Sequence, residues 1–312
     1  MTEVPRTLGP YRVLEAIGPV GPASAARLYS GVGAGGAGMV MLKILPPRAA
    51  AASDPERFER EAAAIAALSH PNVLTLHRAG REGDTFYLAF DFVNGRTLEA
   101  LLKGRRLSLQ EAINIFKGIC RGLQHAHSRG VLHRDLTPRN VFVSDDLQTV
   151  KIADFGLGRT EAGSLTGTIA TSEITFSALY YQAPEAVDAR AKADVRSDLY
   201  SAGAIFHEML TGRAPGNHFG LPSGVNSEVP SSLDMLVLRS VARNPDERPP
   251  TVTALLTELN GLEEDLRLRL LSEIRDFQTM HLPTEGGGKK MIWVAVVVIL
   301  VALAVAAALL LS

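Results

Sequence analysis

Short apolar runs separated by glycine and proline occupy the first hundred residues of the chain. Runs of this length, bounded by turn-forming residues, are typical of β-strands. One helix is expected among them, because Pro55 suits a first turn, Ser53 or Asp54 can cap it, and an alanine-rich, charged stretch follows as far as Leu68. The predicted strands are Tyr11–Ile17, Ala26–Tyr29, Val40–Leu45, Leu74–Arg78 and Phe86–Asp91.

The pattern becomes helical after residue 108. Ser108 and Glu111 have the spacing of a capping box, and Gly130 is a suitable stop. Cys120 lies on the apolar stripe between them, so it is interpreted as a core residue and not as a nucleophile. A small sheet-rich lobe followed by a larger helical lobe is therefore expected. The stripe consists of Leu109, Ala112, Ile113, Phe116, Ile119, Cys120 and Leu123.

Residues 291–311 are twenty-one consecutive apolar residues. A helix of about 20 residues crosses the hydrocarbon core of a bilayer, and buried helices of soluble proteins are rarely uncharged for so long. Lys289 and Lys290 precede the run, and basic flanks stay on the cytoplasmic side. We therefore expect a transmembrane helix over 291–311 that acts as a single-pass C-terminal anchor in the cytoplasmic membrane, with the preceding residues in the cytoplasm.

A second helical pattern precedes this run, over residues 262–277. Two interpretations remain open. The helix pairs with a second copy and forms a homodimer, or it packs on its own domain or on the membrane surface. Its apolar face consists of Leu262, Leu266, Leu270, Ile274 and Phe277.

Composition and charge exclude several classes of protein. Apolar residues make up 46% and charged residues 21% of the chain, which is a globular composition. The 32 basic and 33 acidic residues give a net charge of −1, so a nucleic-acid partner is not expected. The single cysteine excludes an internal disulfide framework and a cysteine-rich zinc site.

Three short segments carry the candidate chemistry: His133–Asn140, Asp154-Phe155-Gly156 and Ala183-Pro184-Glu185. Phosphoryl transfer from a nucleotide needs metal ligands, an acceptor for the proton of the substrate hydroxyl, and a cation at the phosphates. Each segment falls in the strand or loop context in which such a motif is expected. The order and spacing of the three segments are not expected by chance.

The residue types in and around these segments meet those needs. Asp135 is placed to accept the hydroxyl proton. Asn140 and Asp154 offer hard oxygen ligands for Mg²⁺, with Mn²⁺ as the alternative. Lys43, in a predicted strand, supplies the cation, and Glu61 on the predicted helix can pair with Lys43 and hold it.

The ordered motifs HRD-x-x-x-x-N, DFG and APE resemble those of protein kinases, in particular the eukaryotic-like bacterial serine/threonine kinases. The resemblance implies a bilobal α+β fold over residues 10–261. A small antiparallel-sheet lobe with one helix covers about 10–93, and a larger helical lobe covers about 94–261. Residues 1–9 are then a leader, and 262–290 are a juxtamembrane helix with a glycine-rich linker. ATP, a divalent metal and protein substrates are the implied ligands.

The resemblance also implies roles for single residues. Asp198 holds the backbone of the catalytic loop, and Arg248 pairs with a buried Glu185, so both act as scaffold. Phe90 is the gatekeeper beside adenine, and the backbones of Asp91 and Val93 face the adenine ring. The implied ATP-binding residues are Gly18, Val20, Gly21, Lys43, Phe90, Asp91, Val93 and Phe142.

Arg134 precedes Asp135, and in the family such an arginine is balanced by a phosphate on the activation loop. The segment between Asp154 and Glu185 is rich in hydroxyl groups, which favours a phosphorylated loop. An ordinary polar loop is the alternative. The hydroxyl-bearing residues are Thr160, Ser164, Thr166, Thr168, Thr171, Ser172, Thr175 and Ser177.

The chain departs from the family in its nucleotide-binding segments. Pro19 and Pro22 interrupt the glycine-rich loop and each removes an amide donor, so weaker or reshaped nucleotide binding is expected. Met41 stands where the family has a small alanine above adenine, which narrows the pocket. A later group of glycines is interpreted as a β-turn after the strand and not as a second phosphate loop. These are Gly31, Gly33, Gly35, Gly36 and Gly38.

A second departure concerns a lysine and a threonine that serine/threonine kinases carry near the transferred phosphate. Thr137 replaces the lysine, and Ala178 replaces the threonine. Loss of that positive charge is costly unless another group supplies it. Arg139, two residues after Thr137, is the expected catalytic substitute.

Two functions follow from these observations. The first is a membrane-tethered kinase that phosphorylates Ser or Thr, including its own activation loop, because the set Lys43, Glu61, Asp135, Asn140 and Asp154 is complete. The second is a pseudokinase scaffold at the membrane, which the altered glycine loop favours. A small-molecule phosphotransferase is disfavoured, since it would not need the platform for protein substrates that the APE segment resembles.

Overall fold

The structure is a computed structural model that describes residues 6–17, 27–36, 38–45, 55–155, 179–187, 193–216 and 218–280. The chain divides into two compact units, Met1–Leu256 and Thr257–Ser312. Several sequence predictions lie outside the described residues. These are the glycine loop with Gly18, Val20 and Gly21, the helix caps Ser53 and Asp54, the hydroxyls 160–177 with Ala178, and the apolar run 291–311.

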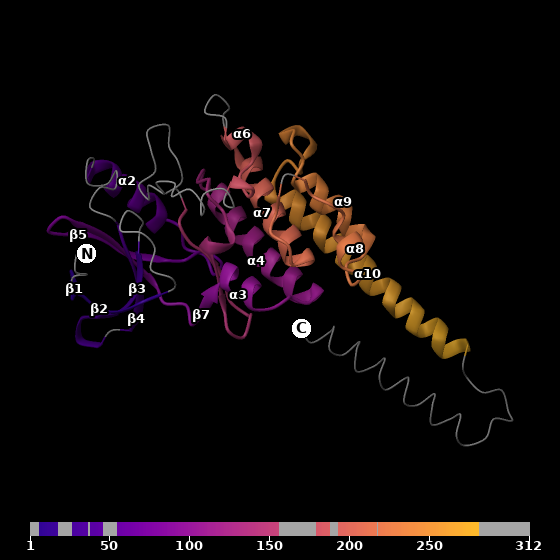
Figure 1. Cartoon of the computed structure of the whole chain (residues 1–312), viewed down its shortest axis with the longest axis horizontal. Helices are drawn as coiled ribbons and strands as arrows, with labels where there is room; N and C mark the ends of the chain where they lie inside the picture. Colours follow the sequence, from indigo (N-terminus) through magenta and orange to yellow (C-terminus); the bar gives the residue numbers. More distant parts are fainter. Residues whose placement is uncertain are drawn as a thin grey trace, which may run out of the picture. The chain divides into compact units, whose positions relative to one another are not determined.

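A six-stranded antiparallel sheet, in the order β1-β2-β3-β4-β6-β5, opens the first unit (Figure 1). The five predicted strands are all present, and a short β1 precedes them. The strands are β1 (Thr7–Leu8), β2 (Tyr11–Ala16), β3 (Arg27–Gly33), β4 (Met39–Ile44), β5 (Leu76–Glu82) and β6 (Thr85–Asp91).

Two of these strands differ from the prediction. β3 runs on to Gly33, so the expectation that Gly31 and Gly33 form a turn after the strand is wrong. Gly31 pairs with Val40 of β4, and a Cβ atom added there would lie 2.6 Å from Leu42 Cδ1, so a larger residue would need the Leu42 side chain to move. β5 is an edge strand whose C-terminal half is largely polar. The apolar pattern therefore predicts an end at Arg78, whereas the strand continues to Glu82.

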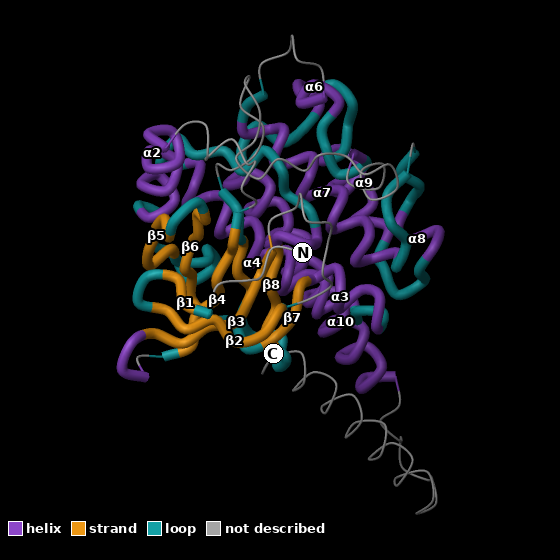
Figure 2. The backbone as a smooth tube through the Cα atoms, turned by 60° about the vertical axis from the view of Figure 1, so that its left-hand side comes forward, coloured by secondary structure: helices purple, strands orange, loops and turns teal. Residues whose placement is uncertain are grey.

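Helix α2 (Pro55–Ala66) packs on the sheet beside β5. Its apolar face, formed by Phe58, Ala62 and Ile65, joins a buried cluster with Phe86 and Leu88 of β6. Figure 2 shows the strands of this sheet gathered on one side, with α2 beside β5 and the helices α4, α7 and α9 on the other side. The predicted sheet lobe and helical lobe are therefore both confirmed.

Helix α4 (Leu109–His127) is the centre of the helical lobe. The predicted capping box is present, because Glu111 N donates to Ser108 Oγ at 3.2 Å and Ser108 N donates to Glu111 Oε2 at 2.8 Å. Cys120 is fully buried, and burial raises the pKa of its thiol, which confirms a core role. The other helices are α3 (Leu98–Gly104), α6 (Pro184–Val187), α7 (Val195–Thr211), α8 (Pro222–Val225) and α9 (Ser231–Ser240).

A second, three-stranded sheet carries the candidate chemistry at its ends. It has the order β7-β8-β9, formed by β7 (Gly95–Thr97), β8 (Val141–Ser144) and β9 (Val150–Ile152). The segment 133–140 leads into β8 through the short 3₁₀ helix Pro138–Asn140, and Asp154 follows β9. Helix α4 approaches β9 closely, because a Cβ atom at Gly118 would lie 2.8 Å from Val150 Cβ.

Helix α10 (Val252–Met280) contains the predicted helix 262–277, and Leu268 and Leu271 are exposed on it. Among the described residues, none of the helices is both long and apolar enough to cross a membrane. The predicted anchor, 291–311, lies outside those residues.

Candidate active site

Lys43 and Asp154, which are 111 residues apart in the sequence, meet in a partly buried ion pair. Lys43 lies on β4, in the interior of the large sheet. Asp154 follows β9 with φ 65°, in the left-handed region that residues other than glycine rarely adopt. Lys43 Nζ is 2.6 Å from Asp154 Oδ2. Glu61 lies half-buried on α2, and its expected pairing with Lys43 stays a prediction.

Asp198, at the start of α7, holds the catalytic loop through hydrogen bonds between its carboxylate and backbone amides of the loop. The amides of His133 and Arg134 donate to the two carboxylate oxygens of Asp198, each at 2.8 Å. His127 Nε2 lies 2.7 Å from Asp198 Oδ2. Burial acts to raise the pKa of this carboxyl, but the contacts with His127 and His133 hold it below its usual range. The scaffold role expected for Asp198 is therefore confirmed.

His133 joins the catalytic loop to the segment that carries Asp154. Its Nε2 is 2.8 Å from the carbonyl oxygen of Ala153, and its ring lies 4.9 Å from that of Phe155. The exposed Arg134 has φ 67° and Asp154 has φ 65°. Residues in both joined segments therefore hold an unfavourable backbone conformation. Such strain persists only where the surroundings fix the chain. The two loops are therefore held together as one unit.

Asp135 is fixed by neighbours from two segments. Asn140 Nδ2 donates to the backbone oxygen of Asp135 at 2.7 Å, and the amide of Asp135 lies 3.3 Å from His133 Nδ1. Gln182 Nε2 donates to Asp135 Oδ1 at 3.4 Å. Burial raises the pKa of the Asp135 carboxyl, which makes its carboxylate a stronger base. Sequence reasoning missed Gln182, whose only signal is its place directly before the APE motif.

Asn140 and Asp154 fit a divalent cation by their donor chemistry. Because Asn140 Nδ2 is bonded to Asp135, the amide oxygen Oδ1 is the atom left to act as a ligand. Asp154 adds a carboxylate, and Mg²⁺ prefers such hard oxygen donors. Ala153 N donates to Asn140 O at 2.8 Å, so the backbone links the two candidate ligands. The residues present are therefore compatible with the expected metal.

The expected adenine-binding residues share one apolar cluster. Phe90, Val93 and Phe142 are buried in it together with Met41 and Ala153. Met41 of β4 pairs directly with Phe90 of β6, so the methionine side chain lies within this cluster. The expected role of these residues in binding adenine stays a prediction.

Asp91, at the end of β6, has a side-chain role that the sequence did not indicate. Its carboxylate lies 2.7 Å from His77 Nε2 of β5 and accepts from Lys151 Nζ of β9 at 3.3 Å. Burial acts to raise the pKa of Asp91, but hydrogen bonds with Thr75 and Lys151 hold it below its usual range. The residue therefore ties the connection between the lobes to both sheets.

Arg139 points to a different partner from the one expected. Its Nε donates to Glu99 Oε1 of α3 at 2.9 Å, and the side chains of Arg139 and Glu99 are 45% and 30% exposed. Thr137, two residues earlier, is buried. The substitution of Arg139 for the absent lysine stays a prediction.

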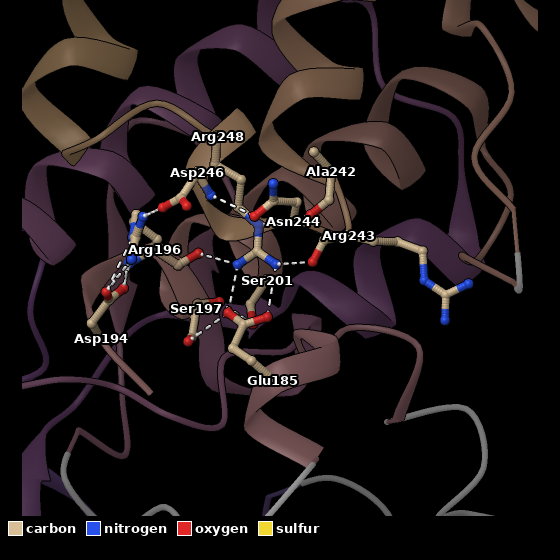
Figure 3. A network of polar contacts seen from close by, with 10 residues as sticks. All are labelled: Glu185, Asp194, Arg196, Ser197, Ser201, Ala242, Arg243, Asn244, Asp246 and Arg248. Carbon is tan, nitrogen blue, oxygen red and sulfur yellow. Dashed lines mark hydrogen bonds and ion pairs between the residues drawn. The ribbon is translucent and has the colours of Figure 1, made fainter. Parts of the chain in front are cut away.

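Arg248 and Glu185 form the buried pair that the sequence indicated (Figure 3). The guanidinium group donates to both carboxylate oxygens, at 2.6 and 2.8 Å, and to the backbone oxygens of Ala242 and Arg196. Ser197 Oγ donates to Glu185 Oε1 at 2.8 Å. Burial acts to raise the pKa of Glu185, but the hydrogen bonds from Arg248 and Ser197 hold it below its usual range. The expected scaffold pair is confirmed.

This fold is found in known proteins. Residues 14–273 match the family model described as the protein kinase domain. A probable serine/threonine-protein kinase of Clostridium perfringens is 31% identical over 232 residues, which cover 70% of this chain and 33% of that protein. A probable serine/threonine-protein kinase PknB of Lactococcus lactis is 36% identical over 219 residues, which cover 65% of this chain and 34% of that protein.

A solved structure is also similar. The PknI kinase domain of Mycobacterium tuberculosis superimposes with a TM-score of 0.65 at 26% identity, and the match covers 82% of this chain and 97% of that one. The chain belongs to the protein kinase family and has its two-lobed fold. It spans about a third of the length of the first curated relatives that it matches, which are bacterial serine/threonine-protein kinases.

Proposed function

We propose that the chain is an active kinase that transfers the γ-phosphate of ATP to serine and threonine hydroxyls of proteins, including its own activation loop. The observation that supports this most directly is the ion pair between Lys43 and Asp154. Asp154 lies on a loop that His133 joins to the segment with Asp135 and Asn140. The groups needed for phosphoryl transfer therefore come together from both lobes.

In this reaction the substrate hydroxyl oxygen forms a bond to the γ-phosphorus, and the bond from that phosphorus to the bridging oxygen of ADP breaks. Asp135 accepts the hydroxyl proton, which its raised pKa favours. Lys43 binds the non-transferred phosphates. Asn140 and Asp154 would hold a divalent metal, which would neutralise charge on the phosphates. ADP and a phosphoprotein are the products.

Arg139 is proposed as the cation at the transferred phosphate in place of the absent lysine. Its present partner, Glu99, is partly exposed, as is Arg139 itself. Exposed ion pairs contribute about 0–1 kcal/mol, so exchange of Glu99 for a phosphate costs little. The arginine lies four residues after Asp135, within the same loop.

The decisive experiment incubates the full chain in detergent with Mg-ATP and maps phosphosites by mass spectrometry. Asp154→Asn is the inactive control, because it removes a metal ligand. We expect phosphate on serine or threonine between residues 160 and 177 in the wild type alone. ATP binding without any transfer would favour the alternative, a pseudokinase scaffold, and transfer only to a small molecule would favour the related small-molecule enzymes.

The same experiment addresses homodimerisation through residues 262–277. The support is the predicted apolar face of Leu262, Leu266, Leu270, Ile274 and Phe277, on which Leu262 and Leu266 are half-buried. Leucines at helical spacing between charged residues support pairing with a second copy, which would bring two kinase domains together. Phosphate incorporation per molecule that rises with protein concentration would support transfer between paired copies, and a constant value would contradict it.

We also propose that residues 291–311 anchor the protein in the cytoplasmic membrane with the kinase domain on the cytoplasmic side. The twenty-one apolar residues after Lys289 and Lys290 support this. The double substitution Val301→Asp and Leu303→Asp is expected to move the protein from the membrane pellet to the supernatant, because each charge costs about 3 kcal/mol at the bilayer centre. Val301→Leu is the matched control. A double variant that still resists carbonate extraction would refute the anchor.

A further inference from the structure

Gln182 makes the side-chain hydrogen bond to the carboxylate of Asp135. Its Nε2 lies 3.4 Å from Asp135 Oδ1. The backbone of Asp135 is already held by Asn140 and His133. The freedom that remains to Asp135 is therefore rotation of its carboxylate about the side-chain bonds, and the side-chain amide of Gln182 lies within hydrogen-bond distance of that carboxylate. Gln182 belongs to none of the motifs that the sequence singles out.

The segment that carries Gln182 is held on both sides. Before it, the hydroxyl of Tyr181 donates to Glu208 Oε2 of α7 at 2.6 Å. After it, Glu185 is locked to the buried Arg248. The backbone amide of Gln182 donates to the backbone oxygen of Leu179 at 3.1 Å. Groups on such restrained segments hold their geometry better than groups on free loops.

The two cations assigned to the phosphates, Lys43 and Arg139, contact other carboxylates. Lys43 Nζ is on Asp154 at 2.6 Å, and Arg139 Nε is on Glu99 at 2.9 Å. Thr137 occupies the position at which the resembling serine/threonine kinases carry a lysine. Among the described residues, Gln182 is thus the residue whose side chain donates a hydrogen bond to the Asp135 carboxylate.

We propose that Gln182 is a positioning residue for the base, and this inference rests on the proposed kinase function. Its amide holds Asp135 Oδ1, which leaves Oδ2 to take the proton of the substrate hydroxyl while that oxygen bonds to the γ-phosphorus and ADP departs. The amide replaces, by a neutral hydrogen bond, the lysine and threonine that are missing at Thr137 and Ala178. A base that is held in the productive orientation gives a higher rate of proton transfer than a base that rotates freely.

The test is steady-state kinetics of the full chain in detergent with ATP and a protein substrate. Gln182→Leu is expected to lower kcat about 10- to 100-fold, with the KM for ATP unchanged, because the variant removes orientation and no nucleotide contact. Gln148→Leu is the matched control, since Gln148 is an exposed glutamine on the turn between β8 and β9. A kcat of Gln182→Leu within about twofold of wild type would overturn the proposal.

A rescue experiment separates positioning from a merely structural role. Thr137→Lys restores a donor beside Asp135, so the double variant Gln182→Leu/Thr137→Lys is expected to recover kcat to within about threefold of Thr137→Lys alone. If Thr137→Lys leaves the loss caused by Gln182→Leu unchanged, the loss is structural and the proposal fails. Neither result alters the conclusion that the wild type is a kinase.

A second readout does not depend on activity. If the wild type transfers no phosphate, the proposed function fails, and the contact is then tested by NMR of glutamine side-chain amides, with the Gln182 signal assigned from its loss in Gln182→Leu. Asp135→Ala is expected to shift the Gln182 amide signal, while that of Gln148 stays unchanged. An unshifted Gln182 signal would show that the contact is absent and would overturn the proposal.

Discussion

Replacing Asp135 by asparagine is expected to lower kcat about 100- to 10,000-fold, which is the contribution of a positioned general base. Asparagine keeps an oxygen that can accept from Gln182, and the backbone contacts with His133 and Asn140 do not involve the side chain of residue 135. The loss is therefore chemical, because an amide cannot take up the hydroxyl proton.

The measurement is kcat and KM of the full chain with Mg-ATP, together with the dissociation constant of ATP. Nucleotide affinity is expected to stay at the wild-type value, since Asp135 receives the proton from the substrate and does not bind the nucleotide. Asp146→Asn is the matched control, because Asp146 is exposed on the turn between β8 and β9. Wild-type kcat in the Asp135→Asn variant would remove Asp135 from the proposed mechanism.

The largest effect on stability is expected from Arg248→Met. Arg248 has a fully buried side chain that donates to both oxygens of Glu185. Methionine leaves the partly buried carboxylate of Glu185 without its cation. Breaking a fully buried ion pair costs about 3–5 kcal/mol, so a loss of about 3 kcal/mol is expected for this pair. Because the pair joins α6 to the segment after α9, the loss should appear in the cooperative unfolding of the whole lobe.

Chemical denaturation followed by circular dichroism measures this change in the free energy of unfolding. Arg243→Met is the matched control, since Figure 3 shows the Arg243 side chain directed away from the network and only its backbone oxygen accepts from Arg248. The control should change stability by less than about 0.5 kcal/mol. Equal losses in the two variants would mean that the buried pair contributes nothing specific.

The lowered pKa of Glu185 gives this pair a defined dependence on pH. A carboxyl whose pKa is lower in the folded state stabilises the fold above its unfolded pKa, and this contribution is lost as the pH falls through the folded value. The wild type is therefore expected to lose stability on acidification below the usual pKa of glutamate. Glu185→Gln lacks this component, so its loss on acidification should be smaller.

Much of the fold followed from local patterns. The apolar runs located every strand of the large sheet but β1, and the capping box of Ser108 and Glu111 placed the start of α4. The limits of β3 and β5 were wrong, because glycine and polar residues pair there through backbone groups that a hydrophobicity pattern does not show. Backbone hydrogen bonds between strands depend on the neighbouring strand and not on local side chains.

The sequence by itself determined the family, the candidate base, the candidate metal ligands and the scaffold pair, because those residues lie in short motifs with fixed spacing. Only the tertiary structure decided three contacts of the site that the motifs do not specify. It placed Lys43 on Asp154, Gln182 on Asp135 and Arg139 on Glu99, contacts that span 40 to 111 residues. Packing brings such distant residues together through whole helices and strands, so no local pattern records the pairing.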